Sequence, residues 1–575
     1  MTARPAGAAD ESAASQAASE AAEAAGALDL LLSDAALGLF RLFRPDPAML
    51  RLAAALARKP QVTGGTVALL AMELGKIVSG RSAVTPHRRD RRFADPAWTE
   101  NPLLKRTMQA YLAAAQTAEG LLGTAELDWR DSERMKFLLA NAIAAAAPSN
   151  NPLLSPAAWK AAIDSGGMSA VRGVRALASD LAAPPRIPMM VEPGAFEVGK
   201  DLAATPGQVV YRTEVFELIQ YQPATETVYR YPLVIVPPMI NKFYITDLAP
   251  GRSMVEYLVG QGHQVFVISW RNPDRRHRAW GLDTYGAAVL AALDTACAIS
   301  RSAKAGICAL CSGGIVSSMV AAHLNETGRM DRLASLYLGV TVLDQSRAGT
   351  AAALVNEATA NAAKVASGSR GYLDGTALAE IFAWLRPDDL IWNYWVNNYL
   401  QGRKPPPFDI LYWNADTTRL PAALHADFIE LGLANALAEP GKATMLGSPV
   451  DLSKVDVPAY VVAGVADHIS PWQSCYRSAR LFGGPVRFIL STSGHIASMV
   501  NPPTNPKATF QTAPESPADP AAWQAAASTV SGSWWPDYSS WLASRGGGQR
   551  RAPRTLGRSP FQPLGPAPGT YVLDR

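Results

Sequence analysis

The chain has 575 residues, of which 48% are hydrophobic and 18% are charged. This is a normal globular composition, and the length predicts two or more packed units rather than one core. The net charge of +4 is spread over a long chain, so bulk charge does not indicate a polyanionic partner such as nucleic acid.

The four cysteines are Cys297, Cys308, Cys311 and Cys475, and the first three lie close together. That spacing does not fit a secreted disulfide framework and suits a reducing cytoplasm. The N-terminus has no basic region before an apolar core, so it does not resemble a signal peptide. The longest apolar stretch, near residues 137–147, is shorter than the roughly 20 residues that span a bilayer. We therefore expect a cytoplasmic protein with no transmembrane segment.

The N-terminal part of the chain is predicted to be helical. Residues 1–26 are rich in Ala, Glu and Ser and cannot bury enough apolar area to offset their ordering entropy, so a mobile tail is expected. From residue 27 to about residue 205, apolar side chains recur at spacings of three and four, as in amphipathic helices. A Pro- and Gly-rich connector ends this helical domain.

The pattern changes near residue 231, where short β-branched runs alternate with helical stretches. Such runs predict parallel strands that helices cover on both faces. The expected strands are 233–236, 264–268, 306–310, 336–342, 460–463 and 486–490.

The third strand runs directly into Ala309-Leu-Cys-Ser-Gly-Gly314, and a small-residue helix follows. This strand–turn–helix context is typical of the nucleophile elbow, normally Gly-x-Ser-x-Gly, on an α/β-hydrolase core. Cys311 takes the place of the nucleophile and Ala309 that of the first glycine. A helix N-terminus favours the thiolate form of the cysteine. Taken alone, Cys311 is more often a buried structural residue, and Cys308-x-x-Cys311 is a weaker redox or metal alternative.

Between the fourth and fifth strands lies an insertion at residues 346–450, rich in Trp, Tyr and Asn. It is too long for a loop. Because it leaves the sheet at the edge where strand C-termini carry ligands, we expect it to form a cap over the site.

The partners of Cys311 are expected after the last two strands, in the order nucleophile, acid, histidine. Asp467 follows the strand at 460–463, and His495 follows the strand at 486–490. We therefore predict a triad of Cys311, Asp467 and His495. His468 is a rival base, but it adjoins Asp467 and its side chain should diverge from that carboxylate. Asp344, after the fourth strand, is a rival acid.

The oxyanion hole is predicted to consist of backbone N–H groups. One donor is the N–H of Ser312, directly after the nucleophile. The second lies in Pro237-Pro-Met-Ile-Asn241. Because prolines lack an N–H group, Met239 or Ile240 is the expected donor.

From about residue 85 onward the chain resembles the single-subunit polyhydroxyalkanoate synthases. The stretches that carry the resemblance are Arg91-Arg-Phe-Ala-Asp-Pro-Ala-Trp98, Pro237-Pro-Met-Ile-Asn-Lys-Phe-Tyr244, Ser269-Trp-Arg-Asn-Pro273, Trp392-Asn-Tyr-Trp-Val-Asn-Asn-Tyr399, Leu411-Tyr-Trp-Asn-Ala-Asp-Thr-Thr-Arg419 and Gly494-His-Ile-Ala. Lipases and esterases share only the fold.

The resemblance implies polymerisation of (R)-3-hydroxyacyl-CoA into a polyester with release of CoA, through a thioester on Cys311. It implies no cofactor and no metal, a homodimer with Trp413 tied to its contacts, and attachment to polymer granules. An esterase or polyester depolymerase with the same triad is the alternative, and the preferred acyl chain length stays open. The expected domains are a tail (1–26), a helical domain (27–205), a core in two parts (206–345 and 451–545), a cap (346–450) and a C-terminal tail (546–575).

The arginines are not expected to bind nucleic acid. Asp90 and Asp95 intersperse the cluster of Arg88, Arg89, Arg91 and Arg92, so a solvated or salt-bridged surface is predicted. The arginines of the C-terminal tail are expected to be flexible.

Overall fold

The computed structural model describes residues 47–88, 90–346, 357–467 and 469–575. The tail expected at 1–26 and the rival base His468 therefore lie outside the described residues. The chain divides into two compact units. Unit 1 contains Phe196–Gly375 and Asp409–Arg575, and unit 2 contains Gly38–Ala195 and Thr376–Phe408.

The centre of unit 1 is a parallel sheet built from the six expected strands. Its order is β13-β12-β7-β6-β4-β5, and each neighbouring pair is parallel. All six strands consist mainly of buried apolar residues, as expected for strands covered on both faces. Their bounds are β4 Leu233–Val236, β5 Val265–Trp270, β6 Ala305–Leu310, β7 Leu333–Gly339, β12 Ala459–Gly464 and β13 Val486–Ser491.

Antiparallel strands extend this sheet at both edges, and the sequence interpretation did not include them. At one edge β2 pairs with β5, β1 with β2, and β17 with β1. At the other edge β14 pairs with β13 and β15 with β14. The bounds are β1 Gly207–Arg212, β2 Phe216–Tyr221, β14 Thr509–Thr512, β15 Ser528–Ser531 and β17 Gly565–Pro566. The central parallel sheet with its helices matches the predicted α/β-hydrolase fold.

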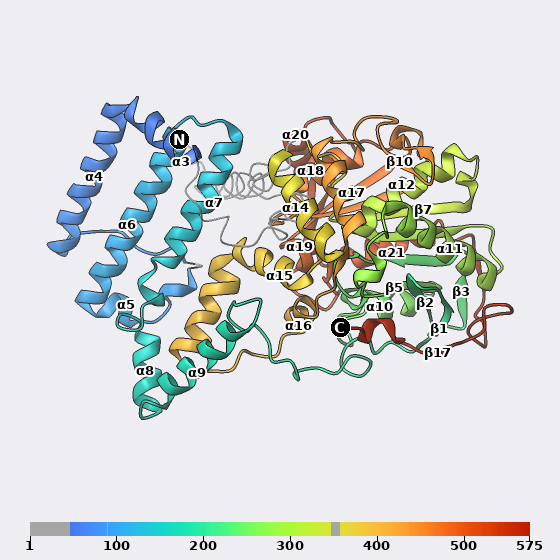
Figure 1. Cartoon of the computed structure of the whole chain (residues 1–575), viewed down its shortest axis with the longest axis horizontal. Helices are drawn as coiled ribbons and strands as arrows, with labels where there is room; N and C mark the ends of the chain where they lie inside the picture. Colours follow the sequence, from blue (N-terminus) through green and yellow to red (C-terminus); the bar gives the residue numbers. More distant parts are fainter. Residues whose placement is uncertain (1–46, 89, 347–356, 468) are drawn as a thin grey trace, which may run out of the picture. The chain divides into compact units, whose positions relative to one another are not determined.

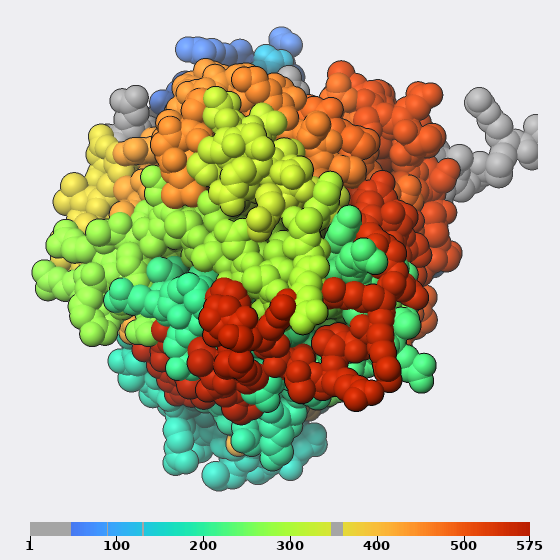
Figure 2. All heavy atoms as spheres, turned by 90° about the vertical axis from the view of Figure 1, so that its right-hand side faces the viewer, coloured from blue at the N-terminus to red at the C-terminus, as the bar shows by residue number. Residues whose placement is uncertain are grey.

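The C-terminal segment lies on the surface of unit 1 (Figure 2), and its pairing with strands of that unit corrects the expectation of a flexible tail. Strand β16 (Gln549–Arg551) pairs with β3 (Thr227–Tyr229). The buried carboxylate of Glu217 accepts hydrogen bonds from the backbone N–H groups of Thr570 and Tyr571, at 2.9 and 3.0 Å. A segment without sequence periodicity is thus held by pairing with residues far away in the chain.

Helices of unit 1 pack on the sheet and on one another (Figure 1). Helices α11 and α12 contact each other as well as β4 and β6, and α18 and α19 contact β12. The helices are α10 Met254–Gly260, α11 Leu282–Ser300, α12 Ser312–Glu326, α14 Glu357–Arg370, α16 Asp409–Ala415, α17 Ala422–Leu433, α18 Trp472–Ala479, α19 His495–Met499, α20 Pro520–Ala526 and α21 Trp535–Ala543. Short strand pairs join β8 Tyr372–Leu373 to β9 Leu420–Pro421 and β10 Thr444–Met445 to β11 Ser448–Pro449.

Helix α11 is the one helix among the described residues that is long and apolar enough to cross a membrane. The sequence interpretation overlooked it. Half of its most apolar window is buried inside the fold. Because α11 packs on α12 and the sheet, its apolar character is that of a core helix.

Unit 2 is helical, as expected for the N-terminal domain. Its helices are α3 Pro47–Ala57, α4 Pro60–Val78, α5 Ala97–Glu100, α6 Pro102–Thr124, α7 Trp129–Ala145, α8 Pro156–Asp164 and α9 Met168–Ala182. Helix α15 (Gly375–Trp384) and the π-helical turns η7 (Pro387–Trp392) and η8 (Trp395–Leu400) complete the unit.

The insertion expected at 346–450 is divided between the two units, because its middle part packs on α9. The Tyr399 hydroxyl donates to Asp180 Oδ2 at 2.7 Å. A Cβ atom at Gly173 would lie 1.9 Å from the carbonyl oxygen of Tyr399, so only glycine allows this approach. The flanking parts of the insertion belong to unit 1.

Candidate active site

Cys311 lies in the turn between β6 and α12, in the backbone conformation of a nucleophile elbow. Its φ and ψ are 50° and −120°, a strained combination for a residue with a side chain. A Cβ atom at Gly313 would lie 2.5 Å from the carbonyl oxygen of Val236, and one at Gly314 would lie 2.0 Å from Thr341 Oγ1. The two glycines are therefore required by close packing. The elbow forms although Ala309 replaces the usual glycine.

Asp467 and His495 meet at the carboxyl ends of neighbouring strands. Asp467 follows β12, and His495 begins α19 after β13. His495 Nδ1 lies 2.8 Å from Asp467 Oδ2. The other oxygen of Asp467 accepts hydrogen bonds from the N–H groups of Ile469 and Ser470, both at 2.9 Å. These contacts fix the carboxylate and leave it one oxygen for the imidazole.

His495 also forms a hydrogen bond with Cys311, so the structure brings all three predicted residues together. Burial by itself lowers the pKa of His495, because it penalises the imidazolium. The charge of Asp467 and the hydrogen bonds to Asp467 and Cys311 outweigh burial and raise this pKa to about 10. Cys311, His495 and Asp467 are 4%, 7% and 0% exposed, so the arrangement is sequestered from water.

The rival acid has other partners. Asp344 Oδ1 accepts hydrogen bonds from the N–H of Ser346 at 2.9 Å and from Asn435 Nδ2 at 3.1 Å. Its other oxygen lies 3.8 Å from Arg477 Nε. Burial alone would raise the pKa of Asp344, but these hydrogen bonds and the arginine charge lower it below its usual value. Asp344 therefore contacts an arginine and an asparagine, and not the histidine that the acid of a triad orients.

Cys308 does not share the surroundings of Cys311. It is fully buried in β6, where burial raises its pKa to about 12 despite a hydrogen bond with Tyr538. The four cysteines are free thiols. A strongly disfavoured thiolate inside a strand does not fit the Cys-x-x-Cys redox alternative.

The predicted oxyanion donors lie beside the elbow. Ser312 is the first residue of α12, where a backbone N–H has no partner within the helix. The Ser312 side chain makes a contact that the sequence did not indicate. Its Oγ accepts a hydrogen bond from the N–H of Met239 at 3.1 Å. The N–H of Ile240 has no acceptor among the described residues. Of the two candidates, Ile240 is therefore the one whose N–H is available.

Trp413 and Cys475 make contacts that the sequence did not predict. Trp413 is 4% exposed in the single chain, and its indole donates to the carbonyl of Lys242 at 2.7 Å. Cys475, in α18, is buried close enough to Asp467 and Cys311 for their charges to raise its pKa further above the level set by burial. Sequence spacing carried no signal for either contact.

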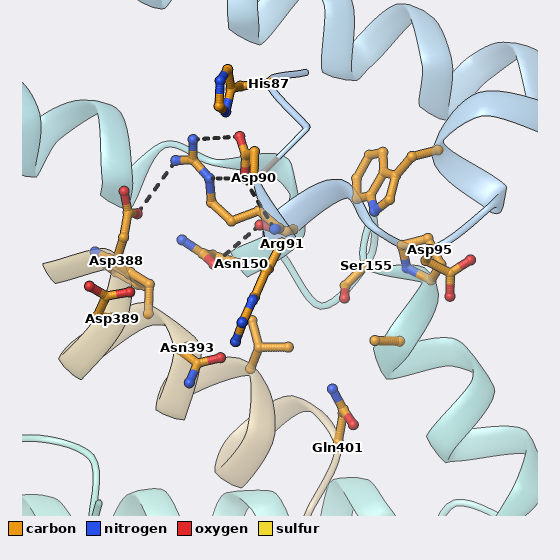
Figure 3. Close-up of a pocket in the computed structure, with 17 residues that line it drawn as sticks. His87, Asp90, Arg91, Asp95, Asn150, Ser155, Asp388, Asp389, Asn393 and Gln401 are labelled. Carbon is orange, nitrogen blue, oxygen red and sulfur yellow. Dashed lines mark hydrogen bonds and ion pairs between the residues drawn. The ribbon is translucent and has the colours of Figure 1, made fainter. Parts of the chain in front are cut away.

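A cavity lies within unit 2, and charged side chains that form ion pairs line it (Figure 3). Its volume is about 760 Å³, and its lining includes Asp90, Arg91, Asp95 and Asp388. Arg92 pairs with Asp90 at 2.9 Å and with Asp388 at 3.4 Å, and Lys160 pairs with Asp95 at 2.6 Å. Within the predicted arginine cluster, Arg92 is therefore salt-bridged, and Arg89 lies outside the described residues. Cysteine is absent from the described residues that line this cavity.

Two protein-family models match the chain. The model of the poly-beta-hydroxybutyrate polymerase (PhaC) N-terminus matches residues 89–258, and the model of the alpha/beta hydrolase fold matches residues 232–502. A crystal structure of a monoacylglycerol lipase from Paleococcus ferrophilus is similar to 58% of this chain and to 100% of that chain, with 13% identity and a TM-score of 0.31.

Two curated relatives cover most of the chain. Poly(3-hydroxyalkanoate) polymerase 2 of Ectopseudomonas oleovorans is 47% identical over 519 residues, which are 90% of this chain and 92% of that protein. The poly(3-hydroxyalkanoate) polymerase subunit PhaC of Cupriavidus necator is 39% identical over 503 residues, which are 86% of this chain and 85% of that protein.

The fold and the site together define an enzyme of the α/β-hydrolase fold with a Cys–His–Asp arrangement at the strand ends. The similarity over nearly the whole chain then fixes the family. The chain belongs to the single-subunit polyhydroxyalkanoate synthases, which are polymerising acyltransferases.

Proposed function

We propose that this enzyme polymerises (R)-3-hydroxyacyl-CoA with release of CoA, and that Cys311 carries the growing chain as a thioester. The observation that carries the proposal is the hydrogen-bonded series from Cys311 through His495 to Asp467 at a strained elbow. Family membership supports polyester synthesis as the overall reaction.

Acylation is the first half of the proposed cycle. The Cys311 thiolate attacks the thioester carbonyl of the substrate, and a C–S bond forms. The N–H groups of Ser312 and Ile240 stabilise the oxyanion. The bond to CoA then breaks, and the departing sulfur takes the proton held by His495. One thioester replaces another, so the acyl group stays activated on the enzyme.

Elongation is the second half, and acylation itself prepares it. Once Cys311 is a thioester, its negative charge and its hydrogen bond to His495 are lost, and both had raised the pKa of His495. The pKa of His495 therefore falls. The neutral imidazole, oriented by Asp467, accepts the proton of the 3-hydroxyl group of the next substrate molecule. The hydroxyl oxygen attacks the enzyme thioester, Cys311 leaves, and an oxygen ester forms. The lengthened acyl-CoA then acylates Cys311 again and releases CoA.

A hydrolase with the same triad is the alternative. The burial of all three side chains supports polymerisation, because water that reached the thioester would hydrolyse it. The test uses the purified chain with (R)-3-hydroxybutyryl-CoA. The expected result is release of CoA with accumulation of insoluble polymer, and loss of both in Cys311→Ala. Soluble hydroxy acid as the sole product would refute polymerisation, and undiminished turnover of Cys311→Ala would refute the nucleophile.

We further propose that the enzyme works in the cytoplasm at the surface of polymer granules, as a homodimer, and needs no cofactor besides its substrate. Exposed apolar side chains in the helical unit support contact with a polymer surface; among them are Trp159, Ile163 and Val174 on α8 and α9. Replacing Trp159 and Ile163 with Ser should reduce co-sedimentation with granules, and unchanged co-sedimentation would contradict this surface.

Comparing turnover of four-carbon and ten-carbon substrates decides the preferred chain length.

A further inference from the structure

The loop that follows β4 is held by a segment far away in the sequence. The Thr418 hydroxyl donates to the carbonyl oxygen of Met239 at 3.2 Å, and both residues are buried. Asn241 and Thr417 form an isolated antiparallel β-bridge. These contacts lie within unit 1, so residues 413–418 of the insertion bind directly to the loop that contains the candidate oxyanion donor.

A buried lysine strengthens the same contact. Lys242 is 3% exposed, and its ammonium group donates to the carbonyl of Asp574 near the C-terminus. Burial lowers the pKa of Lys242, and the nearby charge of Asp416 opposes that shift. Asp416 in turn accepts a hydrogen bond from the Tyr244 hydroxyl at 2.9 Å. Charged groups buried in this way cost free energy if one partner is lost, so they resist separation of the segment from the loop.

The contact with Thr418 bears directly on the oxyanion hole. The carbonyl of Met239 and the N–H of Ile240 belong to one planar trans peptide group, in which the two bonds point in opposite directions. A hydrogen bond that fixes the carbonyl therefore fixes the direction of the N–H. The neighbouring N–H of Met239 is fixed as well, because it donates to Ser312 Oγ.

We infer that Thr418 is a positioning residue, which aims the Ile240 N–H at the oxyanion by holding the carbonyl of Met239. The inference rests on the proposed function, because an oxyanion forms only if Cys311 attacks a carbonyl. Removal of a whole oxyanion donor typically costs about 100-fold to 1,000-fold in turnover. Loss of orientation alone should cost less, roughly 10-fold to 100-fold.

The test compares two reactions of the same cysteine. Alkylation of Cys311 by iodoacetamide is a displacement at a saturated carbon and forms no oxyanion, whereas release of CoA from the substrate requires one. In Thr418→Val, which removes the hydroxyl and keeps the shape, we expect kcat for CoA release to fall about 10-fold to 100-fold. We expect KM and the alkylation rate to stay within about twofold, because the triad and the substrate contacts are unchanged.

Two further variants complete the experiment. Thr418→Ser keeps the hydroxyl and should restore most of the turnover. Thr327→Val removes an exposed hydrogen bond of the same type, from Thr327 Oγ1 to the carbonyl of His323 at 2.8 Å, and should change neither rate. The inference is overturned if alkylation and CoA release fall together, if neither falls, or if Ser does not restore turnover. Failure of the proposed function is seen separately, as CoA release that persists in Cys311→Ala.

Discussion

Substituting Asp467→Asn should change the protonation of the catalytic pair and leave the fold intact. The carboxylate is fully buried, lies 2.8 Å from His495 and supplies the largest effect that raises the pKa of that imidazole. An opposite charge at such a distance shifts a pKa by about 1 to 3 units, which corresponds to roughly 1.4 to 4 kcal/mol. Without it, burial dominates and the pKa of His495 falls from about 10.

The measurable consequence is a change in the pH dependence of alkylation at Cys311. In the parent enzyme His495 keeps its positive charge until the pH approaches its pKa of about 10, so the charge beside Cys311 should stay constant between about pH 7 and 9. In Asp467→Asn that charge should be lost at a pH about 1 to 3 units lower, so the alkylation profile should change shape within this range. CoA release should fall, because elongation also needs an oriented base.

The assay measures iodoacetamide incorporation by mass spectrometry of the separated peptides, because buried Cys475 lies near the same site. Asp344→Asn is the matched control. Its carboxylate also follows a strand of the sheet but pairs with Arg477 and Asn435, so its removal should leave the profile unchanged. A profile for Asp467→Asn that superimposes on the parent, or the shift appearing in Asp344→Asn instead, would refute the assignment.

Three further outcomes are expected. Gly314→Ala should destabilise the fold by about 1 to 3 kcal/mol in denaturant unfolding, because its Cβ would lie 2.0 Å from Thr341 Oγ1. Adding Thr341→Ala should restore part of this loss. If the losses of stability in the two single variants simply add in the double variant, the clash is contradicted. The raised pKa of His495 stabilises the fold fully below about pH 6.5, and this contribution is lost as the pH rises through about 10. The difference in Tm between the parent and His495→Gln should therefore shrink from pH 6 to pH 10. A difference in Tm that stays constant would contradict the raised pKa. Glu217→Leu should release the C-terminal segment at a cost of about 3 to 5 kcal/mol and speed tryptic cleavage within residues 546–575, whereas equal cleavage would argue against this anchor.

Local sequence was sufficient for the elbow and for the central sheet. Parallel strands buried on both faces need continuous apolar runs, and those runs stood out in the sequence. The glycines after Cys311 were equally visible, because a tight turn against β4 tolerates only small residues. Chain order then placed Asp467 and His495 at strand ends, where the structure brings them into contact.

The edges of the sheet were not predictable in the same way. Strands β1, β2, β14 and β15 are antiparallel, and their place depends on which neighbours they meet. The C-terminal segment has no periodicity of its own, and it is ordered by the carboxylate of Glu217, some 350 positions earlier in the chain. The division of the insertion between two units likewise follows from packing of Tyr399 on Gly173.

The sequence by itself therefore predicted the three residues that meet at the strand ends and the fold that presents them, because these depend on local turn geometry and on strand order. Only the tertiary structure decided which backbone N–H can serve the oxyanion and what holds it. That choice depends on the hydrogen bond that Met239 donates to Ser312 and the one that its carbonyl accepts from Thr418, residues that are 73 and 179 positions away. Contacts between residues so distant leave no periodicity or spacing in a single chain, since chain folding alone makes them neighbours.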